Sequence, residues 1–153
     1  MDVSRRDLMI LLPILAGESA AAQSNTLQTA DANSQPKLHS EAYSFSQLPV
    51  HISADGTWKT RPVFDGITSR GQRLTMHISE LAPGKRPHPP ARQPHEEIIV
   101  IREGTLEVSL NGQITTLGPG SVIFSDFNDL NGFKNAGSTW AQYYVISIEQ
   151  HPA

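Results

Sequence analysis

Apolar and polar residues alternate in short runs along most of this chain, and Gly, Pro or Asn residues separate the runs. Alternation with a period of two is typical of β-strands that bury one face. Beyond the first 22 residues, no window places apolar residues at helical spacing over three turns. The pattern therefore predicts an all-β domain with strands at 74–79, 97–102, 105–110, 113–117, 121–124 and 140–148.

Turn residues lie where the alternation stops. Asn111 and Gly112 separate two alternating runs, and Asn-Gly is the strongest short-range signal for a β-hairpin. The sequence at 118–120 is Gly-Pro-Gly, which predicts another chain reversal. With 11 Gly and 11 Pro among 153 residues, the chain suits many short strands in a single domain better than long helices.

The first 22 residues have the three parts of a cleavable export signal. Arg5 and Arg6 supply the positive region, residues 8–17 are uncharged, and residues 20–22 are three alanines. The paired arginines resemble a twin-arginine signal, so we expect an exported, periplasmic protein. The uncharged stretch is too short to span a bilayer core of about 30 Å, so we expect no stable membrane insertion after cleavage. An amphipathic first helix of a cytosolic protein is the alternative interpretation.

The segment that follows the leader is polar. Residues 23–40 contain few large apolar groups and cannot offset their ordering entropy by burial. We therefore assign residues 1–22 to a signal peptide, 23–40 to a flexible tether and 41–153 to one β-domain.

Charge and cysteine content exclude several classes of function. The formal net charge is −3, whereas a nucleic-acid partner requires a basic surface, so none is expected. The chain has no Cys, which excludes disulfides, thiolate metal ligands and cysteine nucleophiles. The sequence also lacks a phosphate-binding loop, a dinucleotide-binding glycine pattern and a serine nucleophile elbow.

Two segments resemble the two motifs of the cupin family. The first runs from Gly84 through Glu97 to Gly104, with six residues between the Glu and the last Gly; the second opens at Gly120 and closes at Asn135. The resemblance covers roughly residues 74–148. It implies a small jelly-roll β-barrel in which two His and a Glu of the first motif, and a His of the second, bind a divalent metal.

The resemblance retains one of the four metal ligands. Glu97 stands at the family's Glu, but the three His positions fall on Ala91, Gln93 and Asn131. Amide oxygens are weak ligands for the transition metals that imidazoles bind, and Ala91 offers no ligand at all. The motif-two Gly falls on Asn128, which we expect to adopt the left-handed conformation that Asn tolerates. The resemblance thus implies the family scaffold with a degenerate metal site.

Other histidines leave a divalent metal ion open as a cofactor. His95 has the same strand parity as Glu97, so a shifted ligand set of His95, Glu97 and either His77 or His88 is one hypothesis. In the other interpretation, His77 is a half-buried strand residue, whereas His88 and His95 are surface loop residues.

Glu97 has two interpretations in the absence of a metal. A carboxyl group inside an apolar barrel can act as a general acid or base, which makes Glu97 a weak catalytic candidate. Alternatively, Glu97 is a structural carboxylate held by Gln93, Asn131 or Arg92, because the motif places no second acid, base or nucleophile.

Three functions remain open, and the sequence leaves it undecided whether the protein is an enzyme. The first is a module that binds a small molecule in the barrel through Gln93, His95, Glu97 and Asn131. The second is a metal-dependent cupin enzyme with a shifted ligand set, such as an oxygenase, isomerase or hydrolase acting on a small organic acid or carbohydrate. The third is a non-catalytic dimeric scaffold. We expect a homodimer, because pairing covers exposed strand edges.

Overall fold

The computed structural model describes residues 35–150. The predicted signal peptide at 1–22 and most of the predicted tether at 23–40 lie outside the described residues. In the described part of the chain, the one helix is a short 3-10 turn, η1 (Phe45–Gln47), and no helix there is long and apolar enough to cross a membrane.

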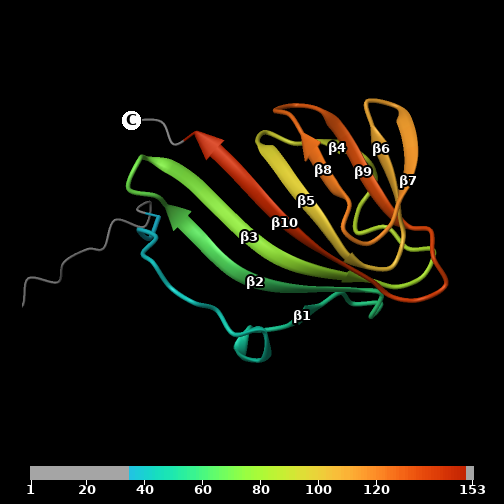
Figure 1. The fold of residues 1–153 in the computed structure, drawn as a ribbon, viewed down its shortest axis with the longest axis horizontal. Coiled ribbons are helices and arrows are strands. Elements are labelled where there is room, and N and C mark those ends of the chain that lie inside the picture. Colours follow the sequence, from blue (N-terminus) through green and yellow to red (C-terminus); the bar gives the residue numbers. More distant parts are fainter. Residues whose placement is uncertain (1–34, 151–153) are drawn as a thin grey trace, which may run out of the picture. The chain divides into compact units, whose positions relative to one another are not determined.

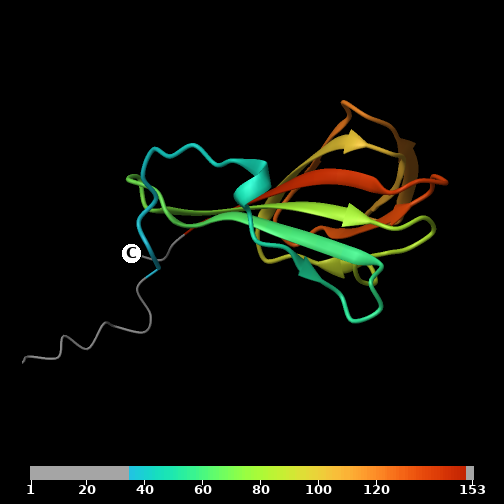
Figure 2. The ribbon, with the colours of Figure 1, turned by 90° about the horizontal axis from the view of Figure 1, so that it is seen from below.

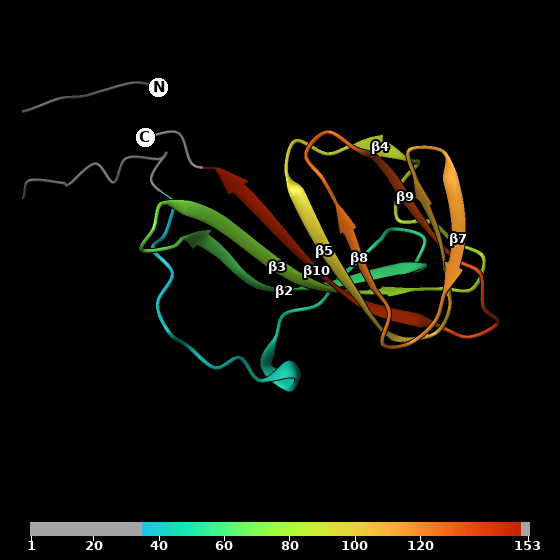
Figure 3. The ribbon, with the colours of Figure 1, turned by 45° about the horizontal axis from the view of Figure 1, so that its top comes forward.

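Ten antiparallel strands form two sheets that face each other (Figures 1 and 3). The larger sheet has the strand order β1-β2-β3-β10-β5-β8, and the smaller sheet has the order β4-β9-β6-β7. The strands are β1 (His51–Ile52), β2 (Trp58–Ile67), β3 (Gln72–Leu81), β4 (Ala91–Arg92), β5 (Glu96–Glu103), β6 (Leu106–Leu110), β7 (Gln113–Leu117), β8 (Val122–Ser125), β9 (Leu130–Asn135) and β10 (Ala141–Gln150). The predicted all-β jelly roll is confirmed, although the sheets stay separate instead of closing into a barrel.

All six strands that the alternation predicts are present, as β3, β5, β6, β7, β8 and β10. The predicted hairpin joins β6 to β7, with Asn111 and Gly112 at φ 49° and 86°, as a type I′ turn requires. Asn128 also has the expected positive φ, 63°. The sequence pattern did not predict β1, β2, β4 or β9.

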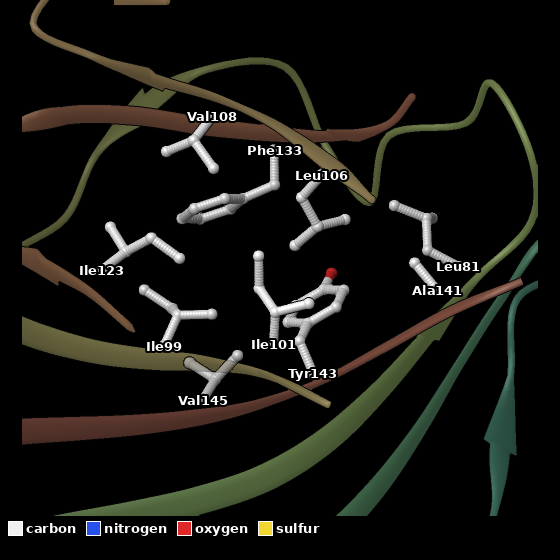
Figure 4. Packing of buried hydrophobic residues seen from close by; sticks show 10 residues of the cluster. All are labelled: Leu81, Ile99, Ile101, Leu106, Val108, Ile123, Phe133, Ala141, Tyr143 and Val145. Atoms are coloured by element: carbon white, nitrogen blue, oxygen red, sulfur yellow. The ribbon is translucent and has the colours of Figure 1, made fainter. Parts of the chain in front are cut away.

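The hydrophobic core lies between the two sheets (Figure 4). Alternate residues of β5 and β10 point inward, so Ile99, Ile101, Tyr143 and Val145 are buried against Phe133 and other side chains of the smaller sheet. The strands β2, β3 and β10 have ten residues each and extend beyond the smaller sheet (Figures 1 and 2). The inner face of the larger sheet is therefore only partly covered.

The end of the predicted tether is bound to β2. Lys37 forms an isolated parallel bridge with Ile67, whose amide donates to the Pro36 carbonyl at 2.8 Å. Leu38 packs over Gly66, where a Cβ would lie 2.4 Å from the Pro36 oxygen. The missing side chain at Gly66 thus lets residues 36–38 approach the strand.

Gly104, between β5 and β6, is constrained both by its backbone conformation and by a close neighbour. Its φ is +81°, and a Cβ there would lie 2.6 Å from the Ala141 Cα. Both the backbone conformation and the close approach of β10 therefore require glycine.

We predict that Gly104→Ala lowers the free energy of unfolding by roughly 2–4 kcal/mol, through backbone strain and overpacking against Ala141. Gly118→Ala is the matched control, because a Cβ there has no neighbour within 4 Å and its φ is not positive. Urea unfolding of both variants measures the difference, and equal midpoints would contradict the assignment.

Candidate functional site

A cavity of about 170 Å³ lies on the inner face of the larger sheet. Three aromatic residues line it, Trp58 of β2, Phe133 of β9 and Tyr143 of β10, together with several polar side chains. A larger hollow of about 360 Å³ lies between residues 38–43 and the β2–β3 hairpin, away from the sequence motifs. Of the four residues predicted to bind a ligand, Gln93 and Glu97 line the smaller cavity, whereas His95 and Asn131 do not.

The four positions that the resemblance assigns to metal ligands lie close together, although only two of them line this cavity. Ala91 on β4 pairs with Asn131 on β9, and the Asn131 side chain is bonded to Glu97 on β5. Gln93 and Glu97 both line the cavity. The backbone amide of Asn128 donates to the Gln93 carbonyl at 2.8 Å, so the left-handed turn at Asn128 helps to position Gln93.

Glu97 is buried and bonded through both carboxylate oxygens. Asn131 Nδ2 donates to Oε2 at 2.9 Å and also to the Ser125 hydroxyl at 3.0 Å. Asn131 and Ser125 are both fully buried. His95 Nε2 is 3.1 Å from Oε1; the ring nitrogen is the donor, because an ionised carboxylate only accepts. Glu97 is therefore held by Asn131 and His95, whereas Arg92 donates to the Asn128 carbonyl instead.

The three candidate histidines occupy different positions. His77 and His88 line the cavity, whereas His95 binds the Glu97 carboxylate and has its Nδ1 3.9 Å from a Glu149 oxygen. His88 donates through Nδ1 to the Pro89 carbonyl at 2.8 Å. Burial lowers the pKa of His77 below its ordinary value, and the negative charge of Glu97 opposes this shift only in part. The His77 ring is therefore uncharged at neutral pH.

The residues present do not fit the metal site that the family resemblance implies. Within residues 35–150, no three His, Asp or Glu side chains are grouped so that they could hold a metal ion. Asn131 turns its NH₂ group, a donor, towards Glu97, and its own oxygen has no hydrogen-bond partner among residues 35–150. Two donors thus point at the carboxylate, where a metal site needs several acceptors that point at one ion.

The sequence pattern does not predict the aromatic part of the site. Trp58 Nε1 donates to the Ser79 hydroxyl at 3.3 Å, and the rings of Phe133 and Tyr143 lie 6.3 Å apart between centroids. Burial raises the pKa of Tyr143 to about 12; the charge of Glu97 adds to the rise, and a hydrogen bond with Ser79 opposes it. Tyr143 therefore keeps its proton at neutral pH. In the sequence, the only signal for this part of the site is strand parity, which places Ser79 on the same strand face as His77.

We predict that Tyr143 makes the folded state sensitive to alkali. Between pH 10 and about 12 the unfolded chain loses this proton while the folded protein keeps it, so the free energy of unfolding falls as the pH rises. A shift from 10.0 to about 12 corresponds to a loss of roughly 2–3 kcal/mol. The free energy of unfolding, measured with urea across this pH range, should fall less steeply with pH in Tyr143→Phe than in the wild type. Tyr144→Phe, on the opposite face of β10, is the control, and an unchanged slope in Tyr143→Phe would refute the prediction.

Comparisons with known proteins agree with this architecture. A family model described as a cupin domain matches residues 77–147. Among solved structures, an RmlC-like cupin from Shewanella frigidimarina NCIMB 400 is 19% identical, with a TM-score of 0.58, and the match covers 72% of this chain and 92% of that chain. KdgF from Halomonas sp. is 15% identical, with a TM-score of 0.59, and the match covers 71% of this chain and 94% of that one.

A third similar structure is the polyketide cyclase RemF from Streptomyces resistomycificus. It is 19% identical, with a TM-score of 0.58, and the match covers 75% of this chain and 83% of that chain. No curated protein matches the sequence. At these identities the structural matches establish the fold and leave the activity open.

Proposed function

This chain belongs to the cupin family, and from that premise we propose that it binds a small organic molecule, without a metal ion, in the cavity beside Glu97. We propose the periplasm as the place of this binding, because residues 1–22 resemble a twin-arginine leader.

The observation that carries the proposal is a buried carboxylate at the wall of a cavity. Removing a carboxylate from water costs several kcal/mol unless other groups pair with it. Here Asn131 and His95 each donate to one oxygen of Glu97, and Ser125 contacts the Asn131 amide. These partners hold the carboxylate in place while Glu97 still lines the cavity. A ligand would therefore meet a preorganised acceptor.

The size and lining of the cavity favour a small ligand with one polar end. The volume of about 170 Å³ is below the usual range of about 300–1,000 Å³ for drug-sized ligands. Tyr143 and Gln93 can donate hydrogen bonds, Glu97 accepts them, and aromatic rings form the apolar part of the wall. A wall that is mostly apolar with a few polar groups is typical of small-molecule sites.

We predict that ligand binding changes the fluorescence of Trp58 and depends on Glu97. The chain has two Trp, so Trp140→Phe leaves the cavity residue Trp58 as the only indole. Titration of this variant with small amines, polyols and carboxylic acids should give a saturable change for at least one compound. The same compound should raise the melting temperature, because it binds the folded state.

In this background Glu97→Ala should abolish the response, whereas the neighbouring Glu96→Ala should retain it, since Glu96 does not line the cavity. Unchanged binding by folded Glu97→Ala would exclude Glu97 from the site. The absence of a response to every compound would overturn the proposed function.

We also predict that the protein, purified without chelator or affinity metal, contains far less than one transition-metal ion per chain. The variant Ala91→His, Gln93→His, Asn131→His restores the imidazole donors around Glu97, so it should bind close to one equivalent. Elemental analysis measures both, with circular dichroism to confirm that the variant is folded. One equivalent of metal in the wild-type protein would contradict the metal-free proposal.

A further inference from the structure

We infer that the cavity beside Glu97 selects a small organic cation with a methylated ammonium group. This inference rests on the proposed function and adds the charge and chemical class of the ligand.

The charge on the cavity wall is negative. Among the residues that line the cavity, Glu97 is an acid and none is Lys or Arg. His77 is uncharged at neutral pH because burial lowers its pKa. Asn131 and His95 each donate a hydrogen bond to the carboxylate, but neither of them lines the cavity. A positive group in the cavity would therefore gain a favourable interaction with Glu97 that no Lys or Arg of the wall supplies.

Arginines near the cavity have other partners. Arg86, which directly precedes the lining residue Pro87, forms an ion pair with Glu107 at 3.1 Å. Arg92, next to Gln93, donates to the Asn128 carbonyl at 2.6 Å. Arg73, on the same strand as the lining residue His77 and four residues before it, pairs with Asp65 and Glu149. An anionic ligand would thus face Glu97 without a cation to offset the repulsion.

The aromatic residues favour a methylated ammonium over a bare ammonium. Trp58, Phe133 and Tyr143 line the same small cavity from three different strands. Aromatic faces attract cations, and a ring of aromatic side chains is the usual recognition site for quaternary ammonium groups. The wall also carries the polar side chains of His77, Ser79, His88 and Gln93. A methylated ammonium has few or no N–H groups to satisfy, so the one carboxylate and the three rings suit it without those side chains. A primary ammonium would need an acceptor for each of its three N–H groups.

The test compares choline with its neutral isostere, the dimethylbutanol in which carbon replaces the quaternary nitrogen. The two molecules have the same shape, so a difference in affinity reports the charge alone. Calorimetric titration of the wild-type protein should give choline an affinity at least about tenfold higher than that of the isostere. Glu97→Gln, which keeps the shape of the side chain and removes its charge, should abolish this preference, and Glu96→Gln should keep it.

Trp58→Leu provides a second test that does not alter the buried carboxylate. It should weaken choline binding more than binding of the isostere, because it removes a ring face. Circular dichroism and thermal unfolding of each variant establish that it is folded before its affinities are compared.

The outcomes separate this inference from the proposed function. Equal affinity for choline and the isostere would overturn the cation inference and leave the small-molecule function standing. Binding of a carboxylic acid or a polyol in the cavity, with no binding of choline, would likewise overturn the cation inference and leave the small-molecule function standing. If no compound in either experiment bound, both proposals would fail.

Discussion

The structure of the site depends on the cost of burying one carboxylate between two sheets. Glu97 lies on β5 of the larger sheet, and its partner Asn131 lies on β9 of the smaller one, so their hydrogen bond of 2.9 Å connects the two layers. The bond to His95, two residues away on the same chain segment, satisfies the other oxygen. Because an unpaired buried charge is strongly destabilising, these contacts tie the position of the carboxylate to the assembly of the fold itself.

The same contacts do not fit the metal site that the family resemblance implies. At the position of the third family His, Asn131 directs an NH₂ group at Glu97 and leaves its own oxygen without a partner in the described part of the chain. An unsatisfied buried acceptor costs about 1–3 kcal/mol, which is part of the cost of holding Glu97 in this orientation. The amide thus binds the carboxylate as a hydrogen-bond donor, where the resemblance places a metal-binding imidazole.

Much of the fold was predictable from the sequence, because six strands show either strict alternation or a β-branched run and Asn111-Gly112 determines a hairpin. β2 was harder to predict, because Pro62 and a bulge between Pro62 and Phe64 interrupt its pattern. β4 has only two residues and follows two prolines, which leaves almost no periodic signal. Local pattern therefore predicts long strands well and irregular or very short strands poorly.

The site was predictable where the family motif or the position of a histidine near it pointed to a residue. The motif led to Gln93, Glu97 and Asn131, and strand parity led to His95, but neither pointed to Trp58. Trp58 reaches the cavity because β2 pairs with β3 in a register that sets it opposite Leu81, and that register is a long-range property of the sheet. The aromatic wall thus comes from tertiary structure, because three strands each contribute one ring to it. The carboxylate on a fourth strand supplies the negative charge that the rings lack. The case for a cationic ligand rests on both features together.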